Sequence, residues 1–117
     1  MKLVDTSVWI EHLRRGSDAL VELLETSSVL VHPFITGELA CGNLINRRQV
    51  IESLEYLPQA VVASESEVLA FIEARQLMGR GVGYIDMHLL ASVQLSPGTR
   101  LWTRDKKLAA LAEELAL

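Results

Sequence analysis

The sequence predicts an α/β fold in which helices cover both faces of a central parallel sheet of about four strands, giving three layers. Short apolar runs alternate with helical hydrophobic periodicity throughout the 117 residues, as expected for strands joined by crossover helices. Half of the residues are hydrophobic, which is enough to bury a core in a chain of this length. No linker, repeat or low-complexity segment interrupts the pattern, so we expect a single domain over residues 1–117.

Taken in order, the apolar runs and the periodic segments define the expected elements. The predicted strands are 3–4, 29–31, 60–63 and 101–103. The predicted helices are 8 to about 16, about 17–25, 33 to about 44, about 47–57, 65 to about 78, 84 to about 95 and 106 to about 115.

Several helix ends carry local signals. Pro33 suits the first turn of the third helix, and Pro58 ends the fourth. Ser64 followed three residues later by Glu67 is a capping-box pattern, which predicts the start of the fifth helix. Residues 79–83 contain three glycines and predict a mobile loop or a tight turn, but their spacing does not match a phosphate-binding fingerprint.

Four acidic residues stand where a parallel sheet would gather them. Asp5 and Asp105 each come just after a predicted strand, and Glu38 lies on the helix that follows the second strand. Asp86 lies at the start of the helix after the glycine-rich segment. Because parallel strands end at one edge of the sheet, and the helices that follow begin there, we expect these four carboxylates to converge on one cleft.

Such a cluster favours a bound cation. Two like charges at about 4 Å cost about 4 kcal/mol at an effective dielectric constant near 20, so the carboxylates must either take up protons or bind a hard ion. Oxygen ligands without a spaced His or Cys partner favour Mg²⁺ or Mn²⁺, and a carboxylate-bound ion of this kind suits phosphodiester hydrolysis. Ser7 and Thr103 are close in sequence to two of the acids, where their hydroxyls could orient a carboxylate or a metal-bound water.

Each acid also has a purely structural interpretation. Asp105 could serve only as the N-cap of the last helix, and Asp86 could be a first-turn acid favoured by the helix dipole. Glu38 could be a solvated helix residue. A purely structural role is hardest to assign to Asp5, because an acid directly after a buried strand rarely stabilises the fold. The single cysteine, Cys41, is expected to be a small buried hydrophobic residue.

The three histidines resemble structural or surface residues more than ligands. His88 is two residues from Asp86 and would face about 200° away from it on an ideal helix. His12 and His32 have no spaced partners in the sequence. We therefore expect no catalytic histidine.

The net charge of −4 neither excludes nor favours a nucleic-acid partner. If four of the 15 acids are pooled in one metal site, the remaining 11 balance the 11 basic residues. No apolar stretch approaches the length of a membrane span, and the N-terminus does not resemble a signal peptide. A lone cysteine fits a reducing cytosol, so we expect a cytoplasmic protein without a membrane partner.

Short motifs occur in a fixed order along almost the whole chain: Leu3-Val4-Asp5-Thr6-Ser7, then Glu38-Leu39, then Asp86 with Leu89-Leu90-Ala91-Ser92, then Thr103-Arg104-Asp105 and Leu108. In this combination the sequence resembles the PIN domain. Within that superfamily it is similar to the VapC toxins of bacterial and archaeal toxin–antitoxin pairs. Members commonly have a final strand after the last helix, and here that strand is expected to be short or missing.

The resemblance implies a Mg²⁺- or Mn²⁺-dependent endoribonuclease that acts as the toxin of such a pair. It implies an acidic pocket of Asp5, Glu38, Asp86 and Asp105, with Asp5, Asp86 and Asp105 as metal ligands and Ser7 and Thr103 in support. It also implies a homodimer, a larger assembly with a VapB-type antitoxin, and an antitoxin tail that blocks the pocket, often with an arginine. With six aromatic residues in all, we expect recognition of a structured transfer or ribosomal RNA by shape and phosphate contacts.

Two other functions compete with this one. The first is a catalytically inactive module of the same fold that binds RNA or an antitoxin, which the presence of all four acids disfavours. The second is a phosphoacceptor receiver domain, which needs an acidic pair after the first strand and an acceptor aspartate after a middle strand. Asp5 stands alone, and no aspartate lies between Asp18 and Asp86, so the receiver domain is set aside.

Overall fold

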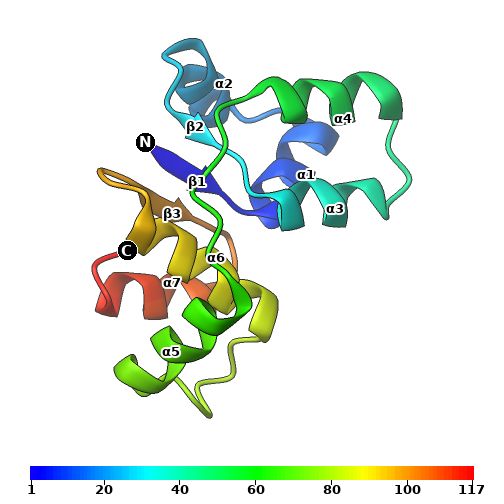
Figure 1. The fold of residues 1–117 in the computed structure, drawn as a ribbon. Coiled ribbons are helices and arrows are strands. Elements are labelled where there is room, and N and C mark those ends of the chain that lie inside the picture. The colour runs from blue at the N-terminus through cyan, green and yellow to red at the C-terminus, as the bar shows by residue number, and fades with distance from the viewer.

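The computed structural model describes all 117 residues and shows short strands alternating with helices (Figure 1). The elements are β1 (Lys2–Val4), α1 (Thr6–Arg15), α2 (Asp18–Glu25), β2 (Val29–Leu30), α3 (Pro33–Ala40), α4 (Arg47–Tyr56), α5 (Glu65–Arg75), α6 (Tyr84–Leu95), β3 (Arg100–Trp102) and α7 (Lys106–Glu114). No helix is both long enough and apolar enough to cross a membrane.

The sheet has three parallel strands in the order β2-β1-β3. Leu3 pairs with Leu30 on one side and with Leu101 on the other, so β1 is the central strand. In Figure 1 helices α1–α4 and helices α5–α7 lie on either side of β1 and β3, which gives the predicted three layers. Because β1 is central, the residue that follows it, Asp5, is delivered to the middle of the edge where the strands end.

The core consists of two apolar clusters. One surrounds β1 and β2 and takes side chains from α1, α3 and α4, with Leu3 and Ile35 fully buried. The other lies between α5, α6 and α7 and includes Phe71 and Leu108. Helix α6 contributes to both clusters, through Leu89 to the first and Leu90 to the second. This helix therefore connects the two halves of the domain.

The predicted strand at 60–63 does not form. Only an isolated bridge joins Val31 to Gln59, and the chain then runs alongside α6 without a strand partner. The amides of Val61 and Ala63 donate to the hydroxyls of Ser96 and Ser92, at 3.1 and 3.4 Å. Ser92 on α6 and Ser96, the residue after this helix, thus satisfy the donors that a sheet neighbour would have taken, and the sheet has three strands instead of about four.

Two helices end earlier than predicted. Helix α3 stops at Ala40, so Cys41 lies outside it and is exposed, contrary to the expectation that it would be buried. Helix α5 begins with the predicted capping box at Ser64 but ends at Arg75, because Gln76 adopts a left-handed conformation with φ of 55°. Arg80 in the glycine-rich segment forms an ion pair with Glu114 at 2.9 Å, which ties this segment to α7.

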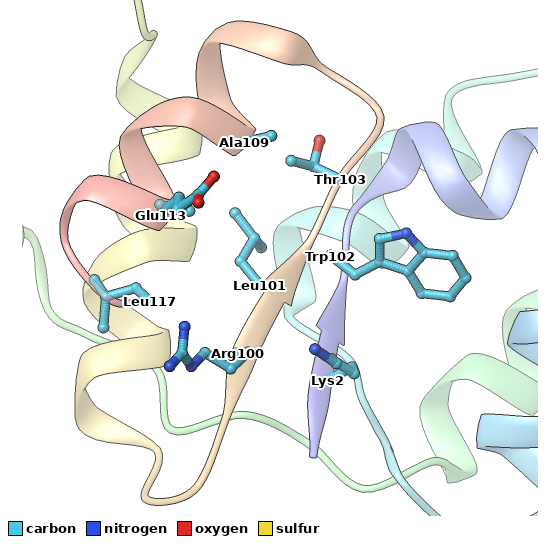
Figure 2. A pocket seen from close by; sticks show the side chains of 9 residues that line it. Lys2, Arg100, Leu101, Trp102, Thr103, Ala109, Glu113 and Leu117 are labelled. Atoms are coloured by element: carbon cyan, nitrogen blue, oxygen red, sulfur yellow. The ribbon is translucent and has the colours of Figure 1, made fainter.

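No strand follows α7, in agreement with the expectation that the final strand would be short or missing. After α7, the carbonyl of Leu117 accepts one hydrogen bond from the amide of Leu101 at 2.6 Å. Beside this contact, between β3 and α7, lies a cavity of about 380 Å³ (Figure 2). Thr103 stands at one end of it and Arg100 towards the other. The outer edge of β3 is thus covered by one residue of the chain end instead of a paired strand.

Candidate active site

Asp5 is the most buried of the four acids, with 7% of its surface exposed. Its amide donates to the carbonyl of Trp102 at 2.9 Å, which continues the β1–β3 ladder by one residue. Its Oδ2 accepts hydrogen bonds from Ser7 Oγ at 2.8 Å and from Thr103 Oγ1 at 2.7 Å. The two hydroxyls that the sequence placed near the acids therefore hold one oxygen of this carboxylate, and no side-chain donor bonds Oδ1.

Asp105 caps α7, as the structural interpretation predicted. Its Oδ1 accepts from the amides of Lys107 and Leu108, at 2.9 and 3.1 Å. The amide of Asp105 donates to Thr103 Oγ1 at 3.1 Å, so Thr103 is hydrogen-bonded to both Asp5 and Asp105. Because capping occupies only one carboxylate oxygen, Oδ2 remains available to a ligand.

Glu38 lies on the second turn of α3 and is oriented by a residue that the sequence reasoning missed. Thr6 Oγ1, at the start of α1, donates to Glu38 Oε1 at 2.7 Å. The only sequence signal for Thr6 was its position directly after Asp5. Its partner is 32 residues away, and no local pattern predicts that pairing.

Asp86 lies in the first turn of α6 and has no hydrogen-bond partner for its carboxylate. Its pKa is raised from 3.8 to about 6, first because burial penalises the charged form, and then because of the charges of Asp5, Asp105 and Glu38. All three of the other predicted acids therefore lie close enough to act on Asp86. The structure brings together the four residues that the sequence singled out.

The cluster has no basic partner. The one ion pair of the chain joins Arg80 to Glu114, away from these acids. Asp5, Glu38 and Asp105 each have one oxygen held by donors within the protein and one without a side-chain donor. Such an arrangement fixes the direction of each carboxylate while leaving negative charge for a cation to neutralise.

The donor set fits a hydrated hard cation better than a closed protein cage. All candidate ligands are carboxylate oxygens, which suit Mg²⁺ and Mn²⁺. As placed, no three His, Cys, Asp or Glu residues are grouped closely enough to hold one ion directly. Mg²⁺ commonly keeps several waters and binds through one or two carboxylates, so a wider group of acids satisfies it.

None of the five main cavities brings the four acids together, and only Glu38 lines one of them. Thr103 lines the cavity beside β3 (Figure 2), and Glu38 lines a second one of about 410 Å³ between α1 and α3. The second cavity is largely apolar, with Ile10, Leu13 and Ile45 in its lining. The acids are therefore not enclosed together in one deep pocket.

The three histidines make no hydrogen bonds to the acids, and two of them contact each other's aromatic neighbours. His12 Nδ1 accepts from the amide of Ser17 at 3.1 Å. His32 and His88 are buried and belong to one aromatic group with Phe34 and Tyr84. The sequence did not reveal this group because the contact that joins its two halves is between Phe34 and His88, which are far apart along the chain. None of the three histidines is hydrogen-bonded to an acid of the cluster.

Comparison with known proteins places these observations in a family context. A model of the PIN domain family matches residues 2–114 of the chain. Ribonuclease VapC32 of Mycobacterium tuberculosis, from strain H37Rv and from strain CDC 1551, is 49% identical to this chain over 114 residues. The alignment covers 97% of this chain and 92% of the relative. The likeness thus extends over almost the whole chain.

Proposed function

This chain belongs to the PIN domain family, and on that premise we propose that it is a VapC-type endoribonuclease, the toxin of a toxin–antitoxin pair. The observation that carries the proposal is the cluster of four carboxylates around Asp86 without a basic partner. A structural role would leave such charges paired or protonated, whereas hydrolysis of a phosphodiester at a metal ion requires them.

We assign Asp5, Asp86 and Asp105 to the binding of Mg²⁺ or Mn²⁺. When bound, such an ion supplies a water of lowered pKa and neutralises charge on the scissile phosphate. Asp5 offers Oδ1 and Asp105 offers Oδ2, since the other oxygen of each is already hydrogen-bonded. Asp86 must lose its proton to bind a cation, and with a pKa of about 6 it does so below neutral pH.

Glu38 is the fourth acid and stands outside the proposed ligand set. Thr6 holds its Oε1, which leaves Oε2 to accept the proton of the attacking water. Ser7 and Thr103 are positioning residues in this scheme, because they fix the Asp5 carboxylate without contacting the substrate. Ser7 Oγ also accepts from the amide of Arg104 at 3.0 Å, which anchors the segment leading to Asp105.

The proposed substrate is a structured RNA of the cytoplasm, a transfer RNA or a ribosomal RNA stem–loop. An open cluster of acids suits a folded RNA better than a pocket for a single nucleotide would. The proposed inhibitor is a VapB-type antitoxin whose tail presents an arginine, because a bidentate guanidinium is the natural partner of uncompensated carboxylates. We propose a homodimer that forms a heterotetramer or larger assembly with the antitoxin.

The alternative is an inactive module of the same fold that binds RNA or the antitoxin. The two functions are separated by expressing the chain with and without its neighbouring antitoxin frame, together with Asp5→Asn and a matched Asp18→Asn control. Asp18 is the first residue of α2 and lies outside the acidic cluster.

The ribonuclease proposal expects growth arrest that the antitoxin relieves, that Asp18→Asn retains and that Asp5→Asn abolishes. With purified protein, cleavage of total transfer and ribosomal RNA should require Mg²⁺ or Mn²⁺ and stop in EDTA. Binding of RNA by well-folded protein, with no cleavage in either ion, would instead establish the inactive module.

A further inference from the structure

Two buried histidines have no assigned role. His32 is fully buried and His88 is 3% exposed. His32 Nε2 and His88 Nδ1 both lack a hydrogen-bond partner. An unpaired buried nitrogen is unfavourable, so these rings must be held in place by other contacts.

Those contacts are aromatic. His32 lies against Phe34 with ring centroids 5.0 Å apart, Phe34 meets His88 at 4.8 Å, and His88 meets Tyr84 at 4.6 Å. All three separations fall within the range of favourable aromatic pairs, and the two contacts of His88 are edge-to-face. We call these four residues the ring stack.

The ring stack joins the two helices that carry Glu38 and Asp86. Phe34 is one turn before Glu38 on α3, and Asp86 lies between Tyr84 and His88 on α6. Apart from the stack, α3 packs chiefly on α1 and α4, whereas α6 packs on α5 and β3. The two acids thus sit in different halves of the domain, and the stack connects those halves directly beside them.

We propose that the ring stack sets the separation between Glu38 and Asp86, with Phe34 and His88 as positioning residues of the acidic cluster. Only the use of Mg²⁺ affinity as a readout rests on the proposed function; the geometric claim does not. The edge-to-face contact between Phe34 and His88 spans α3 and α6 at the level of the acids, and the contact between His88 and Tyr84 holds the His88 ring in place within α6.

Histidine suits the end of this stack because it performs two tasks. His32 Nδ1 accepts from the amide of Phe34 at 3.0 Å and so caps α3, which a phenylalanine could not do. Burial, followed by the charge of His88, lowers the pKa of His32 to about 4. The ring is therefore neutral in the cell, as an aromatic contact in the interior requires.

The test compares Phe34→Leu, His88→Phe and a matched control, Phe71→Leu. Phe34→Leu removes the ring that links His32 to His88, while His88→Phe keeps a ring in the same place without its nitrogens. Phe71→Leu makes the same chemical change in the other core cluster, away from the acids and at a more buried ring, since Phe71 is 7% exposed and Phe34 is 36% exposed. For each protein we would measure the melting temperature, the Mg²⁺ affinity by calorimetry, and the Glu38–Asp86 separation in a crystal structure.

We expect Phe34→Leu to change the separation and to weaken Mg²⁺ binding roughly tenfold, as loss of an outer-shell support typically does. Phe71→Leu should lose stability but bind Mg²⁺ as the parent does. His88→Phe should also retain the parental affinity. The inference is overturned if Phe34→Leu leaves the separation and the affinity unchanged, or if His88→Phe weakens binding as much as Phe34→Leu does.

Failure of the proposed function would look different. In that case the parent protein itself would bind no Mg²⁺ and cleave no RNA. The Glu38–Asp86 separation in Phe34→Leu and Phe71→Leu would still decide whether the ring stack sets it.

Discussion

Replacing Asp86 with asparagine should stabilise the metal-free protein at neutral pH while abolishing cleavage. The carboxylate of Asp86 is half-buried among three other acids, with no donor or cation beside it. An asparagine of the same shape removes that charge and the repulsion that accompanies it. A stabilising substitution that destroys function is the expected mark of an active-site residue.

The size of the effect follows from the raised pKa. The rise from 3.8 to about 6 corresponds to about 3 kcal/mol, which solvent screening at a half-buried carboxyl reduces to about 1–2 kcal/mol. Asp86 also lies in the first turn of α6, where an acid gains about 0.5 kcal/mol from the helix dipole. The net gain expected for Asp86→Asn is therefore about 1 kcal/mol, or roughly 3–6 °C in melting temperature for a domain of this size.

The gain must depend on pH. A carboxyl whose pKa is raised in the folded state binds its proton more tightly there, so stability falls as pH rises from 3.8 to about 6 and is constant above. At about pH 4 the parent is already protonated, and the advantage of Asp86→Asn should vanish. Calorimetric unfolding in EDTA at about pH 4 and about pH 7.5 measures both limits.

Asp18→Asn is the matched control, because Asp18 is also a first-turn acid but lies outside the cluster. Asp18→Asn should lose the stability that the helix dipole gives to a first-turn acid, and it should gain no stability from removed charge repulsion. An Asp86→Asn protein that is less stable than the parent at neutral pH in EDTA, or equally stabilised at both pH values, would refute the assignment of an uncompensated cluster.

Three further outcomes follow from the same contacts. Mg²⁺ affinity, measured by calorimetry, should rise with pH through about 6, because Asp86 must release its proton to bind the ion; an affinity independent of pH between 5 and 7 would contradict this. Thr103→Val removes one of two donors to Asp5 Oδ2 and should weaken Mg²⁺ binding roughly tenfold, whereas parental affinity would show that Thr103 does not position Asp5. Asp105→Ala should lose about 1 kcal/mol of stability, because the helix cap is removed, and it should also lose cleavage. Asp105→Ser should restore the helix cap, as measured by thermal melts, but not cleavage. Recovery of cleavage in Asp105→Ser would limit the role of Asp105 to capping.

The local features of the chain were predictable from sequence. The capping box at Ser64 depends on residues three apart, and the helix that starts at Tyr84 follows a glycine-rich segment. The grouping of Asp5, Glu38 and Asp105 was also predictable, because parallel strands end at one edge and each of these acids comes soon after a strand or lies on the helix that follows one. Asp86 joins them from α6, which follows α5 and not a strand, so this rule does not account for its position. Their catalytic and metal-binding roles remain predictions.

Features that depend on distant partners were not predictable. The run at 60–63 has the composition of a strand, but the amides of Val61 and Ala63 donate to Ser96, which caps α6, and to Ser92 on α6, and no local pattern indicates these contacts. The Thr6–Glu38 contact and the ring stack likewise join residues 32 or more positions apart. Cys41 was misjudged because α3 stops one residue before it, and helix ends are among the least certain sequence features.

The hydrogen bond between Thr103 and Asp5 also bears on the order of synthesis. Its partners are 98 positions apart, and β1 gains β3 as its neighbour only after residue 102 has been made. Translation proceeds from the N-terminus, so Thr103 and Asp105 are among the last residues to be added. Until they are made, the nascent chain lacks Asp105 and one of the two donors that orient Asp5. The acidic cluster is thus completed only when β3 and the residues after it have taken their places beside β1.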